Sequence, residues 1–268
     1  MASPVRQIGY NSPLEAFKSA EREKLAYVTC VSAKWQTTNI PDFIATVDLD
    51  PESSTFSKVR LSITFVVDTQ EFHEKGKAGG PHTVHCLPSG DVMISCLGDE
   101  TGEAKGTFVL LEQGTFKVKG TWQDENDSVE FNYDYWYQPR HNVMVSTEWA
   151  APNVFRNGFF LEDVQKGHYG HSINIWDWTT RKRIQRMDLG AEGLIPLEVR
   201  FLHNPDSAIG FVGCALSSTV FKFHKHSDGS WKSQLVARTP NKKVANWILP
   251  EMPGKIFRYR FIPELKTE

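Results

Sequence analysis

The chain has 268 residues, of which 40% are hydrophobic, 12% aromatic and 23% charged, a profile that excludes intrinsic disorder, collagen-like repeats and coiled coils. Lys and Arg number 30 against 32 Asp and Glu, for a net charge of −2, so the basic excess of a nucleic-acid-binding protein is missing. No apolar run approaches the roughly 18 residues that cross a bilayer, and we expect no transmembrane segment.

The N-terminal residues predict a short helix. Ser12 can cap it, Pro13 suits its first position, and Glu15 completes a capping-box pattern. No apolar segment follows a basic start, so we expect a cytoplasmic protein with reduced thiols. The nucleus and the periphery of a membrane stay open as further locations.

Most of the remaining sequence predicts short strands. Residues 116–119 alternate apolar and polar side chains, which is typical of a half-exposed strand, whereas residues 92–97 are apolar on both faces. A further helical turn is predicted over residues 158–164.

The strands recur in a fixed arrangement. Four hairpin-like units, each an apolar strand, a polar turn and an alternating strand, begin at residues 43–48, 108–111, 173–178 and 220–223. Before three of these units lie two more strands around a turn, within residues 82–97, 133–148 and 197–216. Four strands per unit, recurring about every 45 to 65 residues, are typical of β-propeller blades.

We therefore predict an all-β fold, a partial β-propeller of three to four four-stranded blades in residues 1–254, preceded by the short helix. A two-sheet sandwich is the rival interpretation, but it does not explain the recurrence. Residues 255–268 form a divergent tail that belongs to no blade. Because propellers close with about four to eight blades, we expect unpaired edges and self-association.

Six long motifs allow comparison with known families. They are ATVDLDP (45–51), HTVHCL (82–87), YWYQPRHN (135–142), STEWAAPN (146–153), IPLEVRFLHNP (195–205) and WILPEMPG (247–254). With SPLEA at residues 12–16, they resemble the selenium-binding proteins, a family now regarded as methanethiol oxidases. The resemblance runs from Ser12 to Gly254.

The chain also departs from this family. Between the segments matching Val59 and Phe65, family members carry several tens of residues with a His-His-Ser-Gly-Trp-Asn motif and a Cys-Ser-Ser-Cys motif, both absent here. Family members continue past the segment at 247–254 to a C-terminus with a further histidine. The chain therefore resembles a spliced, mis-predicted or fragmentary product, with about the first half of the family's length and an internal deletion.

The resemblance implies an oxidase that converts methanethiol, O2 and water to formaldehyde, hydrogen sulfide and hydrogen peroxide, with copper as the implicated metal and selenium as a further bound element. His82 and His85 match the family's His-x-x-His-Cys segment and are the candidate metal ligands. Residues three apart on a regular strand point to opposite faces, so only one of the two should reach the central channel unless a turn intervenes. Catalytic residues stay unassigned.

Other candidates concern selenium and the channel. Because the Cys-Ser-Ser-Cys segment is absent, Cys86 and Cys30 are the substitutes for selenium attachment. Glu148 and Glu198 lie in otherwise apolar strands, and a buried carboxylate needs a partner. Arg200 shares the face of Glu198, which favours a structural ion pair and leaves a channel-lining role for all three as the alternative.

Three functions follow from these features. The first is a copper-dependent methanethiol oxidase, with methanethiol and O2 as partners, impaired here because ligands are missing. The second is a non-catalytic selenium- or metal-binding protein with a role in intracellular protein transport. The third is an inactive splice product whose ring does not close.

Overall fold

The computed structural model describes residues 24–30, 43–60, 69–124 and 127–239, with isolated positions at 15, 18, 19, 21, 22, 67, 247–248 and 262–263. Glu15, Lys18 and Ser19 are helical, and the Ser19 hydroxyl donates to the Glu15 carbonyl over 2.7 Å. The predicted capping residues Ser12 and Pro13 lie outside the described residues.

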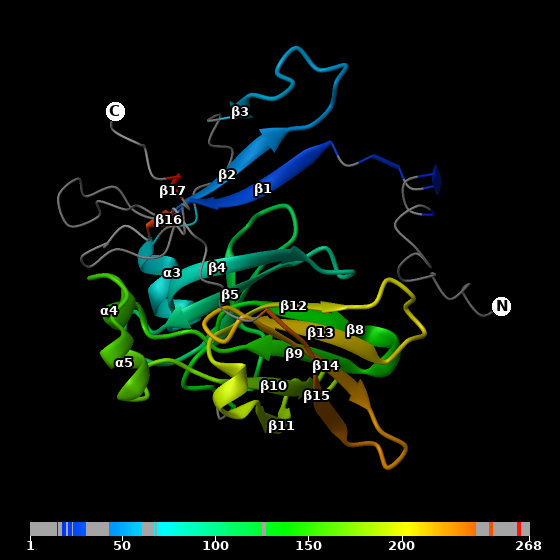
Figure 1. Ribbon diagram of the computed structural model, residues 1–268. Coiled ribbons are helices and arrows are strands. Elements are labelled where there is room, and N and C mark those ends of the chain that lie inside the picture. The colour runs from blue at the N-terminus through cyan, green and yellow to red at the C-terminus, as the bar shows by residue number, and fades with distance from the viewer. Residues whose placement is uncertain are drawn as a thin grey trace.

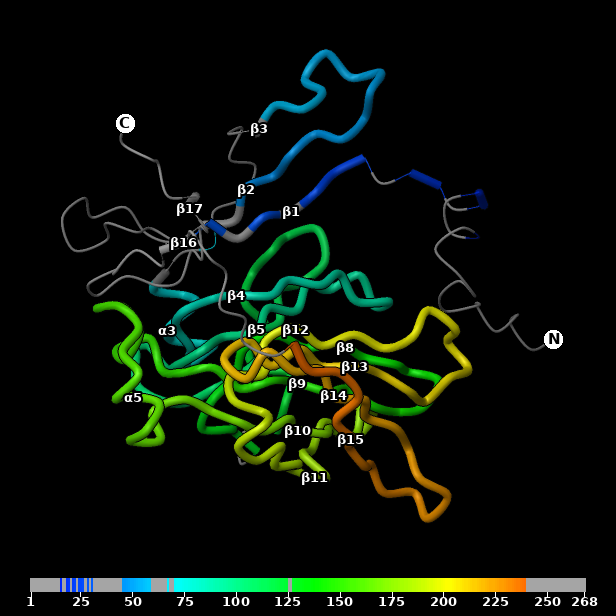
Figure 2. The backbone as a smooth tube through the Cα atoms, viewed as in Figure 1, coloured from blue at the N-terminus to red at the C-terminus, as the bar shows by residue number. Residues whose placement is uncertain are grey.

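Strands dominate the structure, and each sheet is a continuous piece of chain (Figures 1 and 2). The N-terminal sheet is antiparallel and contains β1 (Leu25–Cys30), β2 (Phe43–Asp48) and β3 (Val59–Arg60). Blade A follows with β4 (Gly79–Cys86), β5 (Val92–Gly98), β6 (Thr107–Leu111) and β7 (Val118–Thr121).

Two more four-stranded antiparallel sheets repeat this pattern. Blade B contains β8 (Tyr135–Gln138), β9 (Val143–Thr147), β10 (Ser172–Asp177) and β11 (Arg183–Asp188). Blade C contains β12 (Pro196–Phe201), β13 (Ile209–Cys214), β14 (Thr219–Lys225) and β15 (Trp231–Arg238). In all three blades the strands pair in sequence order, so the predicted all-β, partial-propeller arrangement is confirmed.

Side chains between neighbouring blades form the core. Blades A and B enclose an aromatic cluster in which Phe108 meets Trp122, Tyr135 and Trp176 at ring-centroid distances of 5.3 to 6.0 Å. The buried Trp176 indole donates to the Ser146 hydroxyl. Blades B and C share a cluster of mainly aliphatic and phenylalanine side chains. Since burying one such side chain stabilises a fold by about 1.5–3 kcal/mol, these two clusters hold the blades together.

Within residues 69–124 and 127–239, three short α-helices accompany the sheets. The sequence did not predict α3 (Thr69–Gly76), which packs against blade A and buries Phe72 among Val92, Ile94 and Val109 (Figure 1). It also did not predict α4 (Pro152–Phe155). The helical turn predicted over 158–164 is present as α5 (Leu161–Gln165), which begins three residues later than expected. Among the described residues, no helix is long and apolar enough to span a bilayer.

Two single-turn 3-10 helices, η1 (Pro139–His141) and η2 (Gly190–Gly193), connect strands. Within the predicted tail, β17 (Ile262–Pro263) pairs with β16 (Trp247–Ile248).

Candidate functional site

The first strands of the three blades lie side by side and carry most of the predicted site residues. β12 contacts β8, and β4 reaches the residue before β8, where the Thr83 hydroxyl donates to Asp134. His82 and His85 belong to β4, and Glu198 and Arg200 to β12. Between them β8 and the two residues before it contribute Tyr133–Tyr137. The inner strands therefore bring together residues from all three blades.

A β-bulge in β4 decides how the two histidines point. Pro81 pairs with Cys96 and Val84 with Ile94, so three steps along β4 oppose two along β5, with the extra residue at His82–Thr83. Such a bulge interrupts the regular alternation of side chains. As a result both rings face blade B, with His82 3.9 Å from the ring of Tyr133 and His85 4.6 Å from that of Tyr135. We expected only one of the two histidines to reach the inner side of a regular strand. Because β4 contains a bulge, both do.

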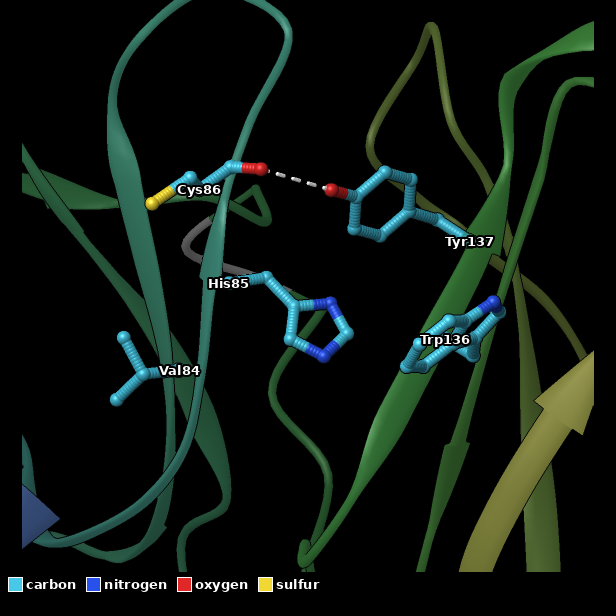
Figure 3. Close-up of a pocket in the computed structure, with 5 residues that line it drawn as sticks. All are labelled: Val84, His85, Cys86, Trp136 and Tyr137. Carbon is cyan, nitrogen blue, oxygen red and sulfur yellow. Dashed lines mark hydrogen bonds between the residues drawn. The ribbon is translucent and has the colours of Figure 1, made fainter. Parts of the chain in front are cut away.

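His85 borders an open pocket of about 360 Å³ lined by Val84, His85, Cys86, Trp136 and Tyr137. Figure 3 shows the His85 ring pointing toward Trp136 and Tyr137, while the side chains of Val84 and Cys86 point to the other side of β4. The Trp136 ring lies edge-on to His85 at 4.8 Å. The Tyr137 hydroxyl donates to the Cys86 carbonyl over 3.1 Å, which closes one side of the pocket.

Burial keeps both imidazoles uncharged at neutral pH. Desolvation lowers the pKa of His82, against the opposing field of Asp134. Desolvation also lowers the pKa of His85 to about 4, with Asp134 opposing and Arg200 reinforcing the shift. Neutral imidazoles can accept hydrogen bonds or bind metals. Burial raises the pKa of Tyr137 to about 12 and that of the Cys86 thiol, so Cys86 is protonated at neutral pH and weakly nucleophilic.

Asp134 ties the three inner strands together. It is 1% exposed, and one carboxylate oxygen accepts from the Thr83 hydroxyl of β4 over 2.9 Å. The other accepts from the Val199 amide over 3.0 Å and from Arg200 over 2.6 Å, both on β12. A buried carboxylate with this many donors is satisfied, and its charge acts on both histidines.

Arg200 and Glu198 form the predicted ion pair, with Nη2 and Oε2 2.7 Å apart. The Arg200 guanidinium also lies over the Trp136 ring, 4.6 Å from its centroid, a cation–π contact. Both charged side chains are partly solvent-exposed, at 48% and 66%, and they flank the His85 pocket through Trp136.

Glu148 lies elsewhere, inside blade B. It follows β9 and accepts two hydrogen bonds from the Arg186 guanidinium of β11, at 2.9 and 3.0 Å. The Asn174 side chain and the Ser172 amide of β10 also donate to it. Glu148 thus joins the outer strands of its blade and does not line the inner strands. Cys30 ends β1, where its thiol donates to the Val28 carbonyl over 3.6 Å.

The described residues offer few side chains that could bind a metal ion together. In the part of the chain that the structure describes, no group of three or more His, Cys, Asp or Glu side chains could hold a metal ion. His82 and His85 supply two neutral imidazoles, which suit copper but do not complete a copper centre.

Sequence reasoning missed Thr83, Asp134, Trp136 and Tyr137. Asp134 between Tyr133 and Tyr135 is a usable signal, because a single acidic residue within an aromatic segment needs a buried partner. Its partners lie 51 and 66 residues away in sequence, so the sequence does not identify them.

Comparison with known proteins gives one family. The model of the 56kDa selenium binding protein family matches residues 5–76 and 60–259. Proteins named methanethiol oxidase are 46% identical in Xenopus laevis and 44% in Homo sapiens, each over 92% of this chain and 64% of the relative. The X-ray structure of a hypothetical selenium-binding protein from Sulfolobus tokodaii has a TM-score of 0.67 and 28% identity over 85% of this chain and 63% of that one.

The chain covers only part of the length of these relatives. The aligned segment spans 64% of the length of these relatives, including the stretch that is missing here. The 307 aligned positions in the Xenopus laevis relative exceed the 268 residues of the chain, so the alignment contains gaps in this sequence. The two family matches overlap at residues 60–76, where the missing internal stretch is expected.

Proposed function

Because the chain belongs to the family of 56-kDa selenium-binding proteins, we propose that it acts as a methanethiol oxidase, the name carried by its relatives. The observation that supports this proposal is the His85 pocket, a small apolar space with one neutral imidazole on its wall.

The pocket suits a small uncharged thiol. Trp136 and Tyr137 offer aromatic surface, and sulfur packs favourably against aromatic rings. His85 can accept the S–H hydrogen bond. As a base it is weak, because its pKa of about 4 lies roughly four units or more below that of an ordinary thiol. We therefore assign His85 to binding and orientation of the thiol rather than to its full deprotonation.

In the proposed reaction, methanethiol, O2 and water yield formaldehyde, hydrogen sulfide and hydrogen peroxide. The carbon loses two electrons and its bond to sulfur, water supplies the carbonyl oxygen, and O2 gains the two electrons to become peroxide. We propose copper as the cofactor, since a bound copper ion can pass electrons between a thiol and O2. His82 and His85 would be part of its ligand set. Because two imidazoles bind copper weakly, we expect slow turnover.

Hydrogen sulfide release from methanethiol tests the proposal. The full 268-residue chain is assayed before and after copper loading, alongside a His82→Ala, His85→Ala double variant and a His226→Ala control, whose histidine is exposed in the turn after β14. We expect slow release by the parent chain and the control, and none by the double variant. Copper binding without any release would instead favour a non-catalytic selenium- or metal-binding protein with a role in intracellular protein transport.

A further inference from the structure

A hydrogen-bonded chain connects His82 to Asp134 through one hydroxyl group. Thr83 Oγ1 lies 3.0 Å from His82 Nδ1 and 2.9 Å from Asp134 Oδ1. A threonine hydroxyl has one proton to donate and lone pairs to accept. Which neighbour receives that proton determines where the proton of the imidazole must lie.

Asp134 determines the direction of the two hydrogen bonds that Thr83 makes. Its other oxygen accepts from the Arg200 guanidinium at 2.6 Å and the Val199 amide at 3.0 Å, two donors that require an acceptor. Paired with a guanidinium, Asp134 is a carboxylate, which accepts and does not donate. The Thr83 proton therefore points to Asp134. Toward His82, the Thr83 oxygen can only accept, so Nδ1 must carry a proton.

We propose that Asp134, acting through Thr83, holds His82 in the Nδ1–H tautomer and leaves the lone pair of the neutral ring on Nε2. Asp134 and Thr83 are thus positioning residues, because they act on His82 and the tautomer decides which nitrogen can accept a proton or bind a metal.

The surrounding contacts fix the orientation of the ring as well as its proton. The Tyr133 ring lies against His82 at a centroid distance of 3.9 Å. The Ser95 hydroxyl accepts from the Thr83 amide over 2.9 Å and donates to the Tyr133 carbonyl over 2.5 Å. The bulge, the ring and the hydroxyl are therefore held as one unit. The use of His82 in catalysis rests on the proposed function, but its tautomer does not.

Nuclear magnetic resonance of the metal-free, full-length chain labelled with 15N-histidine tests the inference. Long-range proton–nitrogen spectra distinguish the two tautomers, and a His82→Gln variant identifies the signals of His82. We expect the parent chain to show His82 almost entirely as Nδ1–H. An Nε2–H pattern in the parent chain would overturn the inference, whatever the variants do.

Two variants separate the hydrogen-bonded chain from simple packing. Thr83→Ser keeps the hydroxyl and should keep the Nδ1–H pattern. Thr83→Val keeps the shape and loses the hydroxyl, and should shift most of His82 to Nε2–H, while the signals of the remote His226 stay unchanged. An unchanged His82 pattern in a folded Thr83→Val chain would also overturn the inference. Failure of hydrogen sulfide release with an Nδ1–H pattern would count against the proposed function alone.

Discussion

The buried carboxylate of Glu148 should contribute strongly to the stability of the fold. This carboxylate accepts from Arg186, Asn174 and Ser172. In Glu148→Ala, two buried donors lose their acceptor and Arg186 loses its partner, so the free energy of unfolding should fall by about 3 kcal/mol. Urea denaturation measures this loss.

Asp206→Ala is the matched control. Asp206 pairs with Arg140 over 2.7 Å, but its side chain is 71% exposed, and exposed ion pairs contribute about 0–1 kcal/mol. If both alanine variants lost the same stability, the buried hydrogen bonds of Glu148 would contribute no more to stability than the exposed ion pair.

His85 should make stability depend on pH. Burial places its pKa at about 4 in the folded chain, whereas the unfolded value is about 6.5. The unfolded state therefore binds a proton as the pH falls through 6.5, and the folded state binds one only near 4. The stability contribution is complete above pH 6.5 and is lost as the pH falls toward 4.

Because the pocket is open, we expect this contribution to be on the order of 1 kcal/mol between pH 7 and pH 5. Urea denaturation of the metal-free chain at both pH values, compared with His85→Gln, isolates it: the variant should lose less stability on acidification. His226→Gln, at an exposed position, is the control for the replacement of a histidine by glutamine. An equal loss in His85→Gln and the parent would contradict the assignment of a buried neutral His85.

Among the elements, α3 carries a prediction of its own. Its Phe72 is 8% exposed and packs against blade A. Phe72→Ala should lower the free energy of unfolding by about 3 kcal/mol, since it removes buried surface and leaves a cavity. Phe56→Ala is the control, because Phe56 lies between β2 and β3 with 48% exposure and should change stability by about 0.5 kcal/mol or less. Thermal unfolding that ranked Phe56→Ala as the more damaging change would show that α3 does not stabilise blade A.

At the scale of the whole molecule, blade C has two different faces. Val212, Phe221 and Phe223 point into the core shared with blade B, whereas Phe211 alternates with them and lies half-buried on the opposite face. Phe211 belongs to none of the core clusters of the described residues. Its cross-strand partners on this face are the charged Arg200 and Lys222, and we expect a second copy of the chain to pack around Phe211 there.

Analytical ultracentrifugation over a range of concentrations tests this expectation. The average mass of the parent chain should rise with concentration, and Phe211→Lys should suppress the rise. Ile184→Lys, at a 57% exposed position on β11, should leave it unchanged. A parent chain that stayed monomeric throughout would exclude self-association through blade C.

Local patterns in the sequence determined the strands and their grouping into blades. Alternation within strands and polar turn residues act over a few positions, so the hairpins at residues 82–97 and 197–216 could be predicted from neighbouring residues alone. The Glu198–Arg200 pair was predictable for the same reason, since two residues on a strand share a face. Long motifs such as HTVHCL identified the family. The helix α3 was missed because its stability comes from packing Phe72 on blade A rather than from its own sequence.

Only the tertiary structure decided which side chains meet on the inner strands. The bulge at His82–Thr83 turns both histidines toward blade B. No local sequence pattern predicts this bulge, because it depends on the register between β4 and β5. Asp134 contacts residues 51 and 66 positions away, and Glu148 contacts Arg186, 38 positions away, instead of lining the inner strands. These partners are chosen by the packing of blades and by the pairing of strands within a blade. Both are non-local, so spacing along the chain cannot specify them.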